Sequence, residues 1–436
     1  MNAVARGFGI RTHYAERRAP ARAVVAAALV LVALLPAGGT APLAALQVGA
    51  EPSEPRLLAD AQRREAVGDL SGSERVLEEL LERYPTSTGG LFAYERILRR
   101  QERVADILPA VDRFLRRDAG ASGARLLKLR VLVEIDSLEE ARAAADAWIA
   151  VDPMSPDPYR ESAAVFESAF GPEAALGVLR RGTAVLDDAP LAIETGDLLL
   201  RMGDRPGALR EWSRALGDEG AHLPAVLQRV GALPPAERSD VLPLVEALAN
   251  PPTTQARRRA AAQIAVEAGL EDEAMALAGE VIPGMAESAR RGFLVGLARQ
   301  AEARAMDRVT LWIYRTLREA TVEAGEARAL DRQIVELAAV AGDTALALAA
   351  QERLATDLPP ASTEQRRATA NSIRLSVAVD PPEAVQRRLD RFRGDFPDAP
   401  ELDALAVTLA ALWVERGNDA AAHRVLQEVR GPQSAL

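Results

Sequence analysis

The sequence predicts an all-α protein of about 22 helices arranged as antiparallel pairs. Three observations support this fold class. Apolar residues recur at intervals of three and four, as between Val76 and Leu81 and between Leu198 and Met202, which is the spacing of one helix face. Breaks that contain Gly-Asp or proline follow at intervals of mostly about 12 to 18 residues. No alternation of Val, Ile and Thr is long enough to predict a strand.

The breaks set the expected ends of the helices in chain order. Glycine supplies the left-handed residue that terminates a helix, and proline prevents its continuation. In order, the breaks are Gly68-Asp69, Tyr84-Pro85, Asp152-Pro153, Gly203-Asp204, Pro234-Pro235, Pro251-Pro252, Gly269, Pro283, Gly342-Asp343, Pro359-Pro360, Pro381-Pro382, Pro397 and Gly417.

Length and composition exclude several classes of protein. A chain of 436 residues is too long for one core, so several units or a repeat array are expected. With no cysteine, disulfides, zinc ribbons and thiol catalysis are excluded. His13, His222 and His423 are too few and too scattered to predict a histidine metal site. We therefore predict neither a metal nor a small-molecule cofactor.

Charge is distributed unevenly along the chain. The net charge is −10, but residues 1–50 hold five arginines against Glu16, a balance of +4. The remainder has 53 − 5 = 48 basic and 63 − 1 = 62 acidic residues, a balance of −14. Nucleic-acid binding favours a basic surface, so no nucleic-acid partner is predicted. Lys128 is the only lysine, which indicates a GC-rich genome more than a special use of arginine.

The first fifty residues resemble an export signal. Arginines precede the apolar run Ala23–Leu35, which is shorter than the ~20 residues that span a membrane. Small residues end at Ala50, the candidate cleavage position, before the polar residues from Glu51 onward. The alternatives are an uncleaved anchor from Ala23 to about Leu46 and a wrongly assigned start. Both the cleaved signal and the uncleaved anchor place the body outside the cytoplasm, in the periplasm or cell envelope. An uncleaved anchor would hold it at the inner membrane.

A repeat of about 34 residues runs through the chain. Gly68 and Gly203 are 135 positions apart, or four such units, and Gly269 follows after 66 positions, or two. Small residues flank each glycine at the positions where two helices of a pair would cross. The same frame recurs, in order, in these runs: Ala61, Gly68-Asp69, Ser73 and Pro85; Asp136, Ala141, Ala145, Trp148 and Pro153; Gly196, Gly203-Asp204, Ala208 and Trp212; Ala410, Gly417, Ala421-Ala422 and Leu426.

This frame resembles the tetratricopeptide repeat family over most of residues 55–436. The resemblance implies a right-handed superhelical solenoid of antiparallel helix pairs, with first helices lining an inner groove. Stacking is also expected on physical grounds, because one amphipathic pair cannot bury its apolar face alone. The expected organisation is a signal peptide or anchor in 1–50, TPR-like repeats in 51–220, degenerate TPR- or HEAT-like repeats in 221–330, and TPR-like repeats in 331–436.

A search for catalytic motifs finds one weak candidate. P-loop, HExxH, GxSxG and GxGxxG patterns are absent. The run from Phe166 to Ala174 resembles the catalytic segment of lytic transglycosylases, which implies Glu167 as a proton donor. The family's following residues are missing, however, and Gly171-Pro172-Glu173 is more simply interpreted as the start of a helix. His222 and His423 are predicted on helix surfaces or ends, and the tryptophans in the core. Arg257–Arg259 and Arg290–Arg291 are predicted on solvated faces, with an anionic partner patch as the alternative.

We therefore predict a non-enzymatic, exported bacterial scaffold that binds a partner protein of the cell envelope. The partner contacts are expected from the first helix of each pair, although the sequence identifies no individual contact residue. A membrane-anchored assembly factor is the main alternative, and a peptidoglycan-cleaving enzyme that uses Glu167 is a weaker one. Self-association is a further possibility, because no polar cap is evident at either end of the repeat array.

Overall fold

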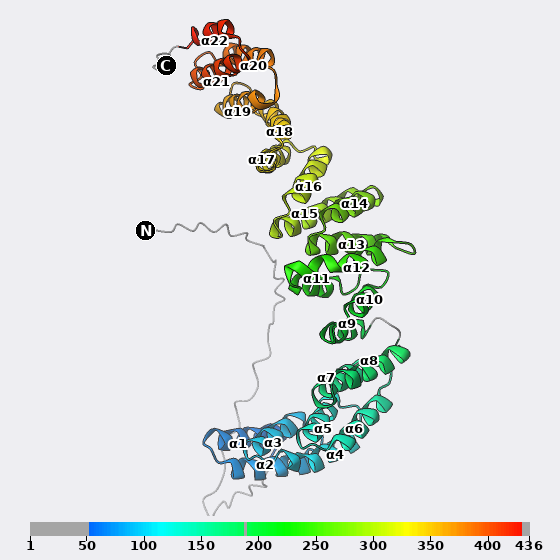
Figure 1. Cartoon of the computed structure of the whole chain (residues 1–436). Coiled ribbons are helices and arrows are strands. Elements are labelled where there is room, and N and C mark those ends of the chain that lie inside the picture. Colours follow the sequence, from blue (N-terminus) through cyan, green and yellow to red (C-terminus); the bar gives the residue numbers. More distant parts are fainter. Residues whose placement is uncertain (1–51, 187–189, 430–436) are drawn as a thin grey trace, which may run out of the picture. The chain divides into compact units, whose positions relative to one another are not determined.

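The computed structural model describes residues 52–186 and 190–429, and this part of the chain is an all-α solenoid (Figure 1). It holds 22 α-helices, as predicted, three short 3-10 helices and no strand. Each helix packs mainly on its neighbours in the chain, so the contacts are those of a stack of helix pairs. The candidate cleavage position Ala50 and the apolar run Ala23–Leu35 lie outside the described residues.

Odd-numbered helices are the first members of the pairs and even-numbered helices the second. The first helices are α1 (Glu54–Ala66), α3 (Thr88–Arg100), α5 (Ser122–Glu134), α7 (Asp157–Phe170), α9 (Ala192–Arg201), α11 (Leu223–Ala232), α13 (Gln255–Ala268), α15 (Glu287–Ala303), α17 (Ala324–Val340), α19 (Thr363–Val379) and α21 (Leu402–Glu415). The second helices are α2 (Leu70–Arg83), α4 (Leu108–Arg117), α6 (Leu138–Val151), α8 (Pro172–Leu186), α10 (Arg205–Leu216), α12 (Leu242–Ala249), α14 (Glu271–Val281), α16 (Asp307–Ala320), α18 (Thr344–Asp357), α20 (Pro382–Asp395) and α22 (Asp419–Leu426). The 3-10 helices are η1 (Val104–Ile107), η2 (Pro235–Val241) and η3 (Ile282–Gly284).

One left-handed residue makes the turn inside eight of the pairs. After α1, Gly68 has φ 82°, its N–H donates to the Glu65 carbonyl (3.0 Å), and the next N–H, of Asp69, donates to the Arg64 carbonyl (2.9 Å). This pair of bonds is the Schellman motif, which satisfies carbonyls at the end of a helix. The left-handed residues are Gly68, Glu102, Asp136, Gly203, Gly269, Ala305, Gly342 and Gly417.

Three of these eight turn residues are not glycine, so the positions of the glycines alone miss three of the eight turns. Glu102 and Asp136 fall 34 and 68 positions after Gly68 and have φ of 62° and 60°. They occupy the units between Gly68 and Gly203 that the 135-residue spacing predicts. Asp69 and Asp204 follow their glycines and accept hydrogen bonds from the first turn of the second helix, which explains the recurring Gly-Asp pair.

Two pairs make the turn with prolines instead. Pro234-Pro235 follows α11 and leads into η2, and Pro381-Pro382 begins α20. Between α7 and α8 the turn residue is Gly171, with φ 88° and ψ 170°, and α8 begins at Pro172. The interpretation of Gly171-Pro172-Glu173 as a helix start is therefore confirmed.

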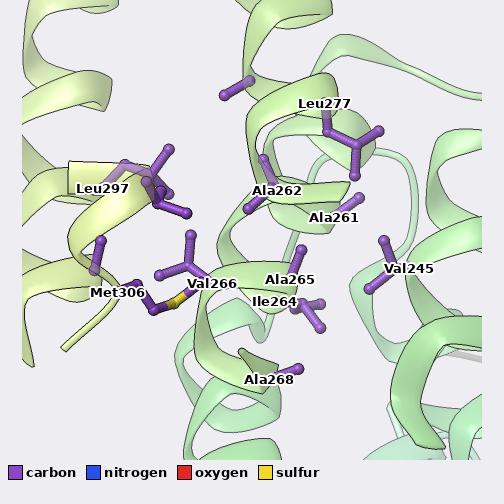
Figure 2. Close-up of a cluster of buried hydrophobic side chains, with 14 of the residues drawn as sticks. Val245, Ala261, Ala262, Ile264, Ala265, Val266, Ala268, Leu277, Leu297 and Met306 are labelled. Atoms are coloured by element: carbon purple, nitrogen blue, oxygen red, sulfur yellow. The ribbon is translucent and has the colours of Figure 1, made fainter. Parts of the chain in front are cut away.

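The largest hydrophobic cluster lies in the middle of the chain and runs from Leu209 to Ala350, across positions 220 and 330 without a break. Its centre is α13, which is buried on several sides because alanines allow other helices to approach closely. Figure 2 shows Val266 pointing toward Leu297 and Met306, while Ile264 points to the other side, where Val245 lies. The stretch that departs most from the repeat pattern in sequence therefore has the most extensive core.

Candidate partner-binding face on the first helices

The first helices share one face, on which residues one repeat apart lie in register. Six positions separated by 34 residues show this most clearly: Leu58, Phe92, Leu126, Arg160, Glu194 and Gln228, from α1, α3, α5, α7, α9 and α11 in turn. All six side chains are exposed or half-buried. We call this surface the first-helix face; its character changes from apolar at the first three positions to polar at the last three.

Leu58, Phe92 and Leu126 form an apolar row on the first-helix face. Phe92 is 39% exposed, which is unusual for a phenylalanine, and the two leucines are half-buried. A Cβ placed on Gly89 would lie 3.3 Å from the Leu58 side chain, and one placed on Gly123 would lie 3.3 Å from the Phe92 ring. The side chains of Leu58 and Phe92 thus each lie over a glycine of the next first helix, and Phe92 is the exposed member of the row.

Ion pairs between successive first helices lie beside the apolar row. The guanidinium of Arg96 donates to both oxygens of Glu65 (2.9 and 2.7 Å), and Arg99 donates to both oxygens of Glu134 (2.7 and 2.8 Å). These bidentate bonds hold α1, α3 and α5 at a fixed offset. Hydrogen bonding from Arg96 also lowers the pKa of the Glu65 carboxyl below its ordinary value.

Between α7 and α11 the first-helix face contains two cavities. The charged side chains that line them form ion pairs. A cavity of about 350 Å³ lies between α9 and α11 and includes Asp197, Arg201 and Gln228. A smaller one of about 150 Å³ lies between α7 and α9 and shares Asp197 and Arg201. Arg229 donates to both oxygens of Asp197 (2.5 Å each), and these bonds raise the pKa of the Arg229 guanidinium.

Glu167, the candidate proton donor, is part of this ion-paired section. Both of its oxygens accept hydrogen bonds from Arg201, one repeat later, at 2.8 Å. Its side chain is 32% exposed on α7, so the carboxylate is held by a guanidinium and does not stand free in an apolar cleft.

The remaining singled-out residues are mostly structural. His222 precedes α11 and His423 lies on α22, both exposed, as predicted for helix ends and surfaces. Trp148 and Trp212 are buried in the core, also as predicted. Among the residues that the structure describes, no group of His, Cys, Asp or Glu is arranged to hold a metal ion.

The prediction that Arg257–Arg259 lie on a solvated face is wrong, because all three side chains are half-buried. Arg257 donates to the carbonyls of Gly217 (3.1 Å) and Ala247 (3.2 Å). The arginine therefore joins α13 to the ends of α10 and α12. Sequence reasoning missed this role because the partners are backbone carbonyls, which leave no residue-type signal.

Comparisons with known proteins find similar chains among solved structures. No protein-family model and no curated protein matches the chain. Among solved structures, MamA matches at 17% identity over 37% of this chain and 90% of its own, with a TM-score of 0.27. A thermophilic TPR protein of Thermus thermophilus, TTC0263, matches at 19% identity over 38% of this chain and 90% of its own, with a TM-score of 0.26. The P58(IPK) TPR domain matches at 12% identity over 87% of this chain and 94% of its own, with a TM-score of 0.21. Because these identities and TM-scores are low, the function is argued from the residues of this chain.

Proposed function

We propose that this protein is a non-enzymatic scaffold that binds a segment of a partner protein on its first-helix face. The observation that carries the proposal is the apolar row of Leu58, Phe92 and Leu126, repeated at 34-residue spacing, in which Phe92 is exposed and both leucines are half-buried. Exposed aromatic side chains flanked by fixed polar groups are typical anchors of protein interfaces. Here the Glu65–Arg96 and Arg99–Glu134 pairs form the polar rim beside the row.

The spacing of the row indicates the form of the bound segment. Packed helices lie about 8 to 10 Å apart, so three successive first helices offer apolar contacts at about that interval. In the polyproline II conformation an extended chain makes one turn in three residues and rises about 9 Å, so every third side chain points the same way. A segment with an apolar side chain at every third position therefore fits the row, and its backbone runs across the first helices.

The proposal places the scaffold in a bacterial cell envelope, either released after cleavage near Ala50 or held by an uncleaved N-terminus. This part is supported by the arginines and apolar run of residues 1–50. Within the described residues, no helix combines the length and the apolar character needed to span a bilayer. Sequencing the N-terminus of the mature protein separates the released form, which begins near Glu51, from the anchored form, which keeps Ala23–Leu35.

Site-specific crosslinking tests the binding role. A photo-reactive phenylalanine analogue in place of Phe92 is expected to crosslink one or two partners in the native envelope fraction, and Phe92→Ser to weaken their capture about tenfold or more. The matched control is position 322, because Val322 is 94% exposed in the turn after α16 and lies off the first-helix face. Equal crosslinking from positions 92 and 322, or unchanged capture by Phe92→Ser, contradicts the proposal.

A further inference from the structure

A second surface of different chemistry lies near the C-terminal end of the described chain, on α19 and α21. Arg367 and Arg374 are seven positions apart on α19, so they lie on one face about 10 Å apart, and both are exposed. α21 packs against α19 and exposes Ala404, Val407, Ala411 and Val414 without a charged residue among them. These six residues define the α19–α21 strip.

Val407 and Val414 make the α21 side of the strip apolar. They are 37% and 55% exposed, on a helix that otherwise packs its leucines into the C-terminal cluster. Glu364, at the start of α19, and Glu415, at the end of α21, are the exposed carboxylates at the two ends of the strip. Its middle therefore combines two guanidiniums with a small, apolar helix surface.

Arg367 and Arg374 have no carboxylate partner among the described residues. Arg96, Arg201 and Arg229 each bind a carboxylate of the preceding first helix. Even the neighbouring Arg366 forms an ion pair with Glu401. In the described part of the chain, by contrast, Arg367 makes no ion pair and Arg374 donates only to the side-chain oxygen of Asn371 (2.6 Å).

We propose that the α19–α21 strip binds an acidic amphipathic helix of a partner protein. Guanidinium groups offer planar sets of N–H donors that match carboxylates. A helix with carboxylates seven positions apart places them about 10 Å apart, opposite Arg367 and Arg374, and its apolar side chains then contact Val407 and Ala411. Two arginines without a carboxylate partner beside an apolar surface are complementary in charge to a carboxylate-bearing ligand.

Fluorescence anisotropy with a designed peptide tests this site in the full chain. The probe is a labelled helical peptide of about 15 residues with glutamates seven positions apart and leucines between them; the same peptide with glutamine for glutamate is its control. We expect saturable binding of the glutamate peptide, at least tenfold weaker binding of the glutamine peptide, and at least tenfold weakening by the double variant Arg367→Glu/Arg374→Glu. Arg367→Lys/Arg374→Lys is expected to retain part of the affinity because it keeps the charge.

A matched double variant controls for general electrostatics. Arg113→Glu/Arg117→Glu makes the same charge change on the exposed side of α4, a second helix, and is expected to alter the affinity less than twofold. Circular dichroism confirms that each variant is folded. Ala411→Glu, which adds a carboxylate to the strip, is expected to weaken binding about fivefold or more.

Three results would overturn the proposal: no saturable binding of the glutamate peptide, equal binding of the glutamine peptide, or equal weakening by the α4 variant. Binding of phosphatidylglycerol vesicles with no binding of the peptide would assign the strip to a membrane surface and also overturn it. Phe92→Ser is expected to leave peptide binding unchanged, so failure of this site and failure of the apolar row are distinguishable.

Discussion

Four of the five helix pairs from α1 to α10 and the middle stretch from α11 to α12 build the same kind of stack with different helix ends. In the first region, a left-handed residue such as Gly68 or Gly203 makes the turn and satisfies the last carbonyls through backbone N–H groups. In the middle stretch, α11 ends before Pro234-Pro235, and the next turn element is a 3-10 helix. The two regions therefore differ in the chemistry of the turn and keep the stacking.

Side chains satisfy the carbonyls where the left-handed turn is missing. Arg238 donates to the carbonyls of Leu233 (3.1 Å) and Gly231 (3.0 Å) at the end of α11. Thr253 donates to the carbonyl of Leu248 (2.6 Å) near the end of α12. The Arg238 bonds take the place of the backbone bonds of a Schellman turn. The comparison shows that a repeat can lose its turn signature in sequence while its core remains continuous.

The left-handed turns give the largest expected effect. Gly203→Ala is expected to lower the free energy of unfolding by about 1 to 2 kcal/mol, because φ of 84° is unfavourable for a residue with a Cβ. No atom lies within 4 Å of the added Cβ, so the cost is conformational. Ala305→Gly, at φ 54°, is expected to raise stability by about 0.5 to 1 kcal/mol. Urea denaturation measures both variants, and a destabilising Ala305→Gly would contradict this explanation of the turns.

Removing the side-chain cap of α11 should have a smaller effect. Arg238→Ala is expected to cost about 1 kcal/mol, since water replaces part of the two lost hydrogen bonds. Hydrogen exchange should rise at the end of α11 and in η2, while α1 to α4 keep their protection, because repeats contact only their neighbours. The control is Arg63→Ala, which removes an exposed pair with Asp60 and should change stability by less than about 0.5 kcal/mol. Equal exchange changes along the whole chain would show that the middle stretch is not an independently capped part of the stack.

The smallest expected effect is the pH dependence of the stability that Glu65 contributes in the first region. The pKa of Glu65 is lowered in the folded chain, first by hydrogen bonding from Arg96 and also by Arg100, while burial opposes the shift. Its contribution to stability is therefore complete above the ordinary pKa of 4.5 and is lost as the pH falls through the lower, folded pKa. Glu65→Gln is expected to reduce stability by less than about 1 kcal/mol at pH 7 and by less than that at pH 3. Urea denaturation of both proteins at the two pH values checks this; the same difference at both would contradict the ion pair as its source.

Much of the fold could be predicted from the sequence because the signals are local. Gly203-Asp204 ends one helix and caps the next through contacts within a few residues, and the structure confirms both roles. Glu102 and Ala305 could not be recognised in the same way. They adopt the left-handed conformation because stacked helices on both sides fix the turn, not because of their own preference.

The candidate site could be predicted only as a face, not as residues. First helices were expected to carry the contacts, but which of their residues remain uncovered depends on what the neighbouring helices bury. Phe92 stays 39% exposed because Gly123 on the next first helix has no side chain to cover it. A short sequence resemblance indicated Glu167 as a proton donor. Its ion pair with Arg201 forms only because two repeats stack.

By itself, the sequence determined the helices, their number, the 34-residue register and the glycine turns, because these depend on hydrogen bonds and steric limits within one or two turns of chain. The tertiary structure decided which carboxylate each arginine binds, which turn residues are held left-handed without glycine, and which apolar side chains remain exposed. These outcomes depend on contacts between residues about one repeat apart, and no local preference specifies such contacts.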